Sequence, residues 1–355
     1  MKGLILAAGL GTRLRPLTSL RPKPTIAVAN KPLIHYAVDN LVAAGIDHIG
    51  VVVGPSTATP IRDTLECYER ARFEFIMQDP PLGLAHAVKV SQPFLGDEAF
   101  VMYLSDNLFE HGITDFVSRF DPSSGVNAVL ALVEVPDPRQ LGVAVVEDGR
   151  IERLVEKPAD PPSNLAVAGV YVFDASVHDA IEGLQPGAKG EYQITDAIQR
   201  MIEAGKTVAP VIVPGWWKDT GKAEDILDAN RLVLGRLRRR VEGTVEDSEL
   251  VGEVVVEPGA VVKGSTVFGP AIVGRDALVE RAYVGPFTTI GDQVTVRDAE
   301  LEYAVVGART RIERVGARIQ ASLIGEDVIL TGHDGRPSSH RLIVGDESRI
   351  ELRES

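Results

Sequence analysis

Residues 2–16 of the chain read KGLILAAGLGTRLRP. The apolar run 2–7 is too short for a signal peptide and arginines follow it at once, so it predicts a buried first strand. Gly9 and Gly11 come directly after this strand. Glycines in that place let backbone N–H groups approach phosphate oxygens closely. The stretch therefore predicts a strand that leads into a phosphate-binding turn.

Two common phosphate-binding motifs do not match this turn. The Gly-x-Gly-x-x-Gly motif of dinucleotide-binding folds requires a third glycine where this chain has Leu14. The Walker motif, in which Gly-Lys-Ser/Thr closes the loop, does not occur here. The turn is followed instead by two cations, Arg13 and Lys23. Cations in fixed positions suit a triphosphate, because the departing pyrophosphate needs charge compensation.

Short apolar runs alternate with helical patterns along the first two-thirds of the chain. The pattern predicts strands at 2–7, 49–53, 73–77, 99–104 and 208–213, and helices at 32–44, 84–90, 194–204 and 225–240. This alternation is typical of an α/β sheet with helices on both faces. Further apolar runs lie close together at 128–135, 143–146 and 151–155, and Asp148-Gly149 is a hairpin pair. We therefore expect a mixed sheet.

A different repeat begins after about residue 243. Apolar residues recur there at intervals of six, and the examples are Val256 and Val262, Val273 and Val279, Val284, Ile290 and Val296, Val306 and Ile312, and Val344 and Ile350. Glycine follows many of the apolar residues, as in Val273-Gly274 and Ile290-Gly291. This period is typical of a parallel β-helix, in which inward aliphatic residues stack from coil to coil. A sandwich of short strands is the alternative. The change of pattern predicts two domains, 1–240 and 241–355.

Composition excludes several classes of partner. The 355 residues carry 37 Lys and Arg against 50 Asp and Glu, a net charge of −13. So acidic a chain has no general attraction to nucleic acid or to an anionic membrane. The single cysteine, Cys67, permits no internal disulfide. We expect a cytoplasmic protein that binds small molecules and neither nucleic acid nor membrane.

The motifs, taken in order, resemble those of the sugar-1-phosphate nucleotidylyltransferases. The signature of that family is Gly-x-Gly-Thr-Arg-Leu followed by a Pro-Lys-Pro segment, here residues 9–14 and 22–24. Further matches are the base-reading loop at 78–87, Ser105-Asp106-Asn107-Leu108, Glu156-Lys157-Pro158 and Trp217-Lys218-Asp219-Thr220-Gly221. The chain is most similar to the longer glucose-1-phosphate thymidylyltransferases, which carry a C-terminal left-handed β-helix.

This resemblance implies a Rossmann-like, mixed-sheet nucleotidyltransferase domain and a left-handed parallel β-helix of hexapeptide repeats. It implies a nucleotide site formed by Ala8, Gly9, Gly11, Thr12, Arg13, Lys23, Gln78, Pro81 and Gly83. The sugar phosphate would contact Asn107, Gly142, Glu156, Lys157 and Val167. Mg²⁺ would be held by Asp106 and Asp219 through oxygen.

The implied reaction is transfer of a thymidylyl group from dTTP to α-D-glucose 1-phosphate, which gives dTDP-glucose and pyrophosphate. The nucleophile is a phosphate oxygen that is already anionic, so catalysis needs positioning and charge neutralisation rather than a general base. Arg13 would stabilise the leaving pyrophosphate, Lys23 would hold the nucleotide phosphates, and Lys157 would hold the sugar phosphate. These three cations are the catalytic candidates.

The sequence is also compatible with other functions. Uridylyl transfer from UTP would use the same pyrimidine edge, and a single methyl group discriminates by only about 1–3 kcal/mol. The chain could also be a non-catalytic regulatory subunit that binds sugar nucleotides. An acyltransferase tail would need a histidine within the coils, but His333 and His340 lie in a Gly/Ser/Pro-rich loop. We expect the tail to be structural and to join copies of the chain into a homo-oligomer.

Overall fold

A computed structural model of the chain describes residues 1–187, 190–332 and 347–351. The chain divides into two compact units. The first comprises Met1–Leu10, Pro22–Thr25 and Leu33–Asp219, and the second comprises Gly11–Arg21, Ile26–Pro32 and Thr220–Ser355. Two short N-terminal segments therefore group with the C-terminal part. The domain boundary at 240/241 stays a prediction.

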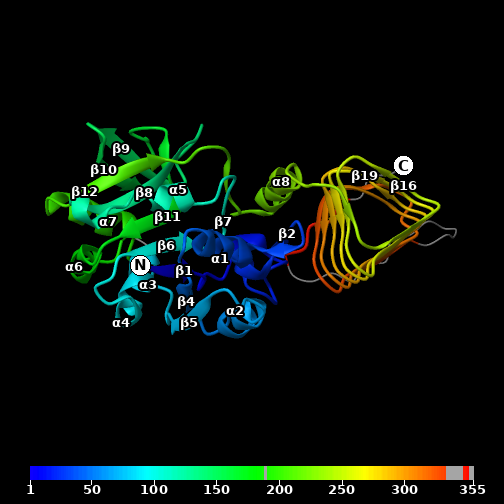
Figure 1. Cartoon of the computed structure of the whole chain (residues 1–355), viewed down its shortest axis with the longest axis horizontal. Coiled ribbons are helices and arrows are strands. Elements are labelled where there is room, and N and C mark those ends of the chain that lie inside the picture. Colours follow the sequence, from blue (N-terminus) through cyan, green and yellow to red (C-terminus); the bar gives the residue numbers. More distant parts are fainter. Residues whose placement is uncertain (188–189, 333–346, 352–355) are drawn as a thin grey trace. The chain divides into compact units, whose positions relative to one another are not determined.

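A nine-stranded mixed sheet forms the centre of the first unit (Figure 1). Its main path is β10-β9-β11-β6-β1-β4-β5, and β8 pairs with both β11 and β12. The strands are β1 (Lys2–Leu6), β4 (His48–Val53), β5 (Arg72–Met77), β6 (Phe100–Leu104), β8 (Val126–Glu134), β9 (Gly142–Glu147), β10 (Arg150–Glu156), β11 (Leu165–Phe173) and β12 (Thr207–Ile212). Strands β6, β1, β4 and β5 run parallel, whereas β11 is antiparallel to β6. The predicted mixed sheet is confirmed.

The hairpin between β9 and β10 turns at the expected pair. Asp148 and Gly149 both have positive φ, at 47° and 75°. A two-residue turn with positive φ at both positions matches the twist of the flanking strands, and glycine adopts it without a steric penalty. Two sequential strands are thereby joined antiparallel at the edge of the sheet.

Helices cover both faces of this sheet, as the alternating pattern predicted. They are α1 (Leu33–Ala43), α2 (Ala58–Leu65), α3 (Leu84–Val90), α4 (Gln92–Leu95), α5 (Thr114–Val117), α6 (Ser176–Glu182) and α7 (Ile194–Glu203). Side chains from α3, α6 and α7 join one core, and those from α1, α2 and α5 join another. Strand β1 supplies Leu4 and Leu6 to the first core and Ile5 to the second, because successive strand residues point to opposite faces.

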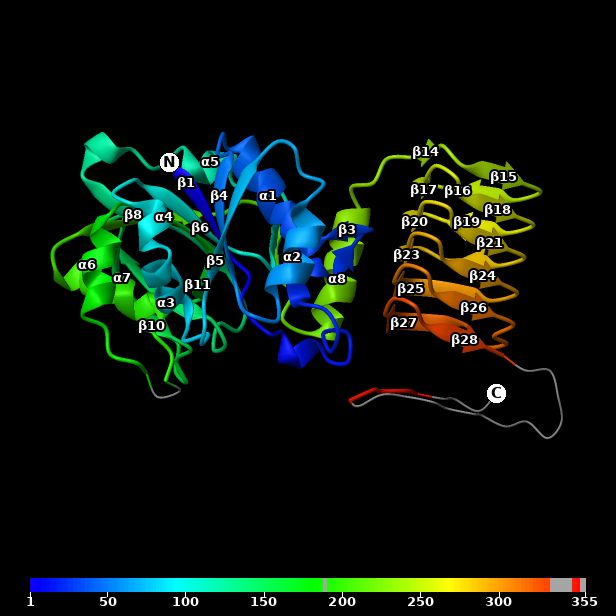
Figure 2. The same cartoon turned by 90° about the horizontal axis from the view of Figure 1, so that it is seen from below.

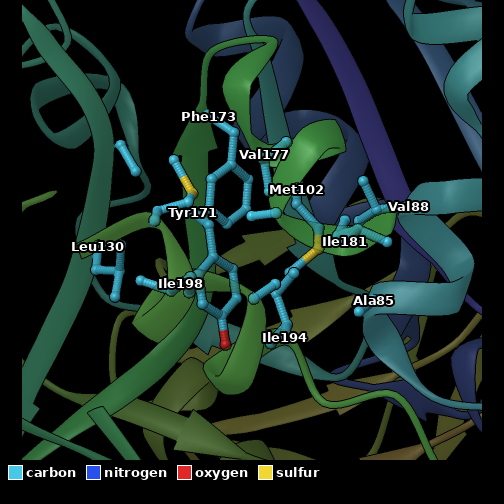
Figure 3. Packing of buried hydrophobic residues seen from close by; sticks show 14 of the residues in the cluster. Ala85, Val88, Met102, Leu130, Tyr171, Phe173, Val177, Ile181, Ile194 and Ile198 are labelled. Carbon is cyan, nitrogen blue, oxygen red and sulfur yellow. The ribbon is translucent and has the colours of Figure 1, made fainter. Parts of the chain in front are cut away.

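Figure 3 shows the first of these cores around two aromatic rings of β11. Tyr171 and Phe173 are stacked with ring centroids 5.7 Å apart, and both lie on one face of the strand. Ile194 and Ile198 of α7 and Met102 of β6 pack around them. The core holds α7, whose first residues carry part of the site described below.

The second unit is dominated by short parallel strands stacked in coils (Figure 2). One sheet has the order β14-β17-β20-β23-β25-β22-β19-β16, with β27 on β25, and another has the order β15-β18-β21-β24-β26-β28. The strands are β14 (Arg240–Val241), β15 (Thr244–Glu246), β16 (Glu249–Val251), β17 (Val254–Val256), β18 (Val261–Lys263), β19 (Thr266–Phe268), β20 (Ala271–Val273), β21 (Leu278–Glu280), β22 (Tyr283–Val284), β23 (Thr288–Ile290), β24 (Thr295–Arg297), β25 (Glu300–Val306), β26 (Arg311–Glu313), β27 (Ile319–Ile324) and β28 (Ile329–Thr331).

The six-residue repeat accounts for the interior of these coils. Val262, Val279 and Val296 are fully buried and lie in one ladder of paired strands. All of these pairings are parallel, which argues against an antiparallel sandwich and agrees with the expected left-handed β-helix. Val344 and the histidines His333 and His340 lie outside the described residues.

Helix α8 (Ala223–Leu234) is shorter than predicted. The expected helix at 225–240 is wrong over residues 235–240, because the helix ends before Gly235 and Arg240 begins β14. The basic run after the helix contacts acids of the β-helix instead. The backbone N–H of Arg239 donates to Glu253, and Arg240 Nη2 donates to Glu257 Oε1 at 2.6 Å.

A buried asparagine connects α8 with two other parts of the second unit. Asn230 Oδ1 accepts from the N–H of Ala29 at 2.9 Å and from Thr289 Oγ1 at 2.8 Å. Ala29 lies in the turn between β2 (Ala27–Val28) and β3 (Lys31–Pro32). Asn30 Nδ2 adds a bond to the Ile290 carbonyl at 2.8 Å. The N-terminal hairpin, α8 and the β-helix are therefore one packed body. No helix in the described part of the chain is long and apolar enough to cross a membrane.

Candidate active site

Two aspartates and a lysine from distant segments meet in the first unit. Asp106 lies between β6 and β7 (Asn107–Phe109), and Asp219 ends β13 (Trp217–Asp219). Antiparallel pairing of β13 with β7 sets Asp219 opposite Asn107, and so beside Asp106. Lys23 Nζ lies 2.5 Å from Asp106 Oδ2 and 3.8 Å from Asp219 Oδ1. The predicted metal ligands and one predicted catalytic cation thus form one cluster.

The position between the two carboxylates favours a positive charge, since the Lys23 ammonium lies there. Carboxylate oxygens are the ligands that Mg²⁺ prefers, and Mg²⁺ is usually bound by one or two carboxylates together with water and substrate phosphates. Among the described residues, no group of three or more His, Cys, Asp and Glu side chains could enclose a metal. The pair therefore fits a Mg²⁺ ion that is shared with a bound phosphate.

A chain of hydrogen bonds orients Asp106. Asn107 Nδ2 donates to Asp106 Oδ1 at 2.8 Å, and Trp217 Nε1 donates to Asn107 Oδ1 at 2.7 Å. The backbone carbonyl of Asn107 accepts from the Tyr103 hydroxyl at 3.0 Å. Gly169 has φ +69°, and a Cβ there would lie 2.8 Å from the Asn107 side chain. The side chain of Asn107 thus fixes the Asp106 carboxylate, and its expected contact with the sugar phosphate stays a prediction.

Trp217 and Tyr103 were not assigned roles from the sequence. Trp217 stands two residues before Asp219 within the matched motif, so its position was visible. The partner of its indole nitrogen was not, because that contact joins β13 to β7 and appears only in the folded sheet.

The candidate base-reading loop is built around Gln78, which follows β5 and is buried. Gln78 Nε2 donates to the Gly83 carbonyl at 2.9 Å and lies 3.1 Å from His86 Nδ1. Burial and nearby Lys89 lower the pKa of His86, which keeps the imidazole neutral and able to accept this bond. Pro81 is exposed at the tip of the loop.

Gly83 must be glycine for two reasons. Its φ is +102°, and a Cβ at this position would lie 2.6 Å from the carbonyl oxygen of Tyr192. The N–H of Tyr192 donates to the Leu82 carbonyl at 2.7 Å, so the two segments lie in direct backbone contact. This approach fixes the loop against the segment that precedes α7.

The candidate sugar site lies where β9, β10, β11 and α7 meet. Glu156 Oε1 accepts from Lys157 Nζ at 2.7 Å, and its Oε2 accepts from Thr195 Oγ1 at 3.2 Å. A Cβ on Gly142 would lie 2.9 Å from Thr195 Cγ2 and 3.7 Å from Val167 Cγ2. The structure thus brings Gly142, Glu156, Lys157 and Val167 together. Thr195, which orients the carboxylate, was missed by the sequence analysis.

The remaining predicted nucleotide residues lie in the turn after β1. Ala8 and Gly9 belong to the first unit, and Gly11, Thr12 and Arg13 belong to the second. Gly11 has φ 61° and precedes the short 3₁₀ helix Thr12–Leu14. Thr12 and Arg13 are exposed, whereas Leu14 after them is buried. The turn therefore presents its hydroxyl and guanidinium groups to solvent.

Comparisons with known proteins identify the family of the chain. The family model described as nucleotidyl transferase matches residues 2–236. A glucose-1-phosphate thymidylyltransferase of Streptomyces antibioticus is 42% identical over 99% of both chains, and one of Streptomyces griseus is 43% identical over 99% of both. A solved structure of a Bacillus anthracis protein, assigned as a glucose-1-phosphate thymidylyltransferase and in complex with sucrose, is 33% identical with a TM-score of 0.61, and covers 65% of this chain and 94% of that one. The chain belongs to the nucleotidyl transferase family.

Proposed function

We propose that the protein transfers a thymidylyl group from dTTP to α-D-glucose 1-phosphate. The observation that carries this proposal is similarity over the whole length, tail included, to two Streptomyces proteins named glucose-1-phosphate thymidylyltransferase. The cluster of Lys23, Asp106 and Asp219 supports it, because phosphoryl chemistry needs positioned charges of this kind.

The reaction needs no proton transfer. A phosphate oxygen of glucose 1-phosphate attacks the α-phosphorus of dTTP, and a new P–O bond forms. The bond from the α-phosphorus to the bridging oxygen breaks, and its electron pair leaves with pyrophosphate. Arg13 compensates the charge on pyrophosphate, Lys23 holds the nucleotide phosphates, and Lys157 holds the incoming sugar phosphate.

Asp106 and Asp219 would hold Mg²⁺ in this proposal. When bound, the ion supplies charge neutralisation to the phosphates. Asn107 then acts through Asp106 by fixing the carboxylate, and Trp217 fixes Asn107. Ligand carboxylates are commonly oriented in this way by further hydrogen bonds.

The base is held by the loop around Gln78, and the sugar is held where β9, β10, β11 and α7 meet. The amide nitrogen of Gln78 is engaged with Gly83, which leaves the amide oxygen to accept from N3–H of a pyrimidine. Glu156, held by Thr195, accepts from sugar hydroxyls. Thymine and uracil share the N3–H group, so discrimination between dTTP and UTP depends on the 5-methyl group and the 2′-position.

Pyrophosphate release with Mg²⁺ and glucose 1-phosphate tests the proposal. Purified protein is assayed with dTTP, UTP and GTP in parallel. We expect the highest kcat/KM with dTTP. A preference for UTP would replace the substrate and keep the mechanism, whereas no release with any nucleotide or sugar 1-phosphate would leave the regulatory-subunit alternative.

We also propose that the β-helix joins copies of the chain into a homo-oligomer. Val251 and Phe268 are paired on neighbouring strands β16 and β19, and each is 36% exposed. Exposed large apolar side chains on one face are typical of contact surfaces. Sedimentation of the protein and of Phe268→Glu tests this proposal. We expect the parent protein to have a mass that is a multiple of the 38.2 kDa chain mass, and the variant to have a lower mass. A monomeric parent protein would refute it.

A further inference from the structure

The turn that begins at Gly11 is closed by hydrogen bonds between residues of the second unit. The N–H of Leu14 and the hydroxyl of Thr18 both donate to the carbonyl of Gly11, at 2.9 and 2.8 Å. Thr18 is 8% exposed, so this second bond is shielded from water. The segment Gly11–Arg21 is therefore a closed loop that carries the exposed side chain of Arg13.

This loop packs against the β-helix at the residues that directly follow β27. The Leu17 side chain comes within 3.7 Å of the position that a Cβ on Gly325 would occupy. At the end of the loop, both terminal nitrogens of Arg21 donate to the carboxylate of Glu326, and the Nη2–Oε2 distance is 2.7 Å. These two residues are 305 positions apart in the sequence. The loop is thus attached to the C-terminal part of the chain.

Glu326 is itself held from the other side. Arg309 Nη2 donates to Glu326 Oε2 at 2.5 Å, and Arg309 Nε donates to Asp327 Oδ1 at 2.7 Å. The side chain of Glu326 is 24% exposed between its two arginine partners. A two-pronged pair within such a network is stronger and more directional than an isolated surface pair.

We propose that Glu326 is a positioning residue for the loop Gly11–Arg21, so that the β-helix holds Arg13 in position. This inference rests on the proposed function in one respect, namely that Gly11, Thr12 and Arg13 bind the triphosphate. A cation on a short loop stabilises a leaving group best when it is already in place, because no reorganisation is then needed during the reaction. The tail thereby acts in catalysis, in addition to the role in assembly that we propose above.

The kinetic test compares Glu326→Gln with the unchanged full-length protein. We expect kcat/KM for dTTP to fall about tenfold, and KM for pyrophosphate in the reverse reaction to rise, with KM for glucose 1-phosphate unchanged. Arg21→Gln is expected to have the same effect. The double variant should be no worse than either single one, since the two side chains act as one pair.

Asp298→Asn is the matched control. Asp298 forms a two-pronged pair with Arg281, at 2.8 and 2.9 Å, on the same β-helix. Its loss should leave every kinetic constant unchanged. Melting temperatures and circular dichroism of both variants establish that the tail stays folded.

Hydrogen exchange of residues 11–21 provides a readout that does not depend on activity. We expect faster exchange in Glu326→Gln and no change in Asp298→Asn. Unchanged exchange in Glu326→Gln, or an unchanged kcat/KM for dTTP with a folded tail, would overturn the inference. An equal loss of activity in Asp298→Asn would also overturn it, because the effect would then belong to tail stability in general. A parent protein without pyrophosphate release would instead refute the proposed function, and exchange would still decide whether Glu326 holds the loop.

Discussion

The two units use the same kinds of charged group in different arrangements. In the first unit, Lys23 lies between two carboxylates, those of Asp106 and Asp219, and is only 11% exposed. On the β-helix, Arg281 meets Asp298 on the next coil, and their side chains are 56% and 41% exposed. The site is assembled from three separate segments, whereas the tail pair joins residues 17 positions apart on neighbouring coils. Arg281 also meets a second acid, because its Nη1 donates to Glu280 Oε1 at 2.8 Å. Two acids around one cation therefore occur in both units, and the site differs from the tail because its cation is shielded from water and its partners come from distant segments.

The largest effect is expected from Asp106→Asn. The substitution keeps the shape and removes the charge that would hold Mg²⁺, so we expect kcat to fall at least about 100-fold. The melting temperature should change little. Pyrophosphate release and thermal unfolding measure the two quantities. Near-normal turnover would show that the convergent carboxylates are no more functional than those of the tail.

Val279→Ala is the counterpart in the tail. Val279 is fully buried in the stacked interior, and loss of two methyl groups with the cavity that remains should cost about 2 kcal/mol in the free energy of unfolding. Activity well below the melting temperature should be retained. Denaturant unfolding is the measurement, with Val241→Ala as the control, since Val241 is 43% exposed. Equal destabilisation by both would argue against a packed β-helix interior.

Trp217→Phe sharpens the account of the site. It keeps an aromatic ring and removes the N–H that holds Asn107, so Asp106 loses its fixed orientation. We expect kcat to fall about tenfold and the Mg²⁺ concentration for half-maximal rate to rise. Trp216→Phe is the control, because Trp216 contacts Glu110 through its backbone N–H. Equal effects of both variants would assign the loss to aromatic packing.

The smallest expected effect is on the pH dependence of stability, which differs between the two units. Burial lowers the pKa of His178, which stacks on Phe100 in the first unit. The unfolded chain therefore takes up this proton first, and stability falls as pH drops from about 6.5 through the lower folded value. His178→Phe should flatten that part of the profile.

In the tail, the effect of pH on Asp298 falls in a lower range. Hydrogen bonds from Arg281 lower the pKa of Asp298, so its contribution is present above about pH 4 and is lost only as pH falls further. Thermal unfolding from about pH 2 to pH 8 measures both effects. An unchanged profile in His178→Phe would show that this histidine is not responsible for loss of stability in weak acid.

Much of the fold was predictable, and the errors have physical causes. The helix at 84–90 and the hairpin at Asp148-Gly149 were confirmed, because each depends on residues adjacent in sequence. Helix α8 was predicted too long, because the helical spacing of apolar residues continues past Gly235 whereas the helical backbone ends at Leu234. The site was recognised as a set of motifs, but Thr195 and Trp217 were missed, since their roles depend on partners that lie on other elements.

The sequence by itself determined the strand and glycine turn at the N-terminus, the order of the motifs and the six-residue repeat. Each of these depends on neighbouring residues and on the periodicity of strand and turn. Only the tertiary structure decided that Asp106 and Asp219 converge on Lys23, and that Arg21 pairs with Glu326. Those contacts join segments far apart in the chain, and they form only when the hydrophobic cores have brought the strands into register.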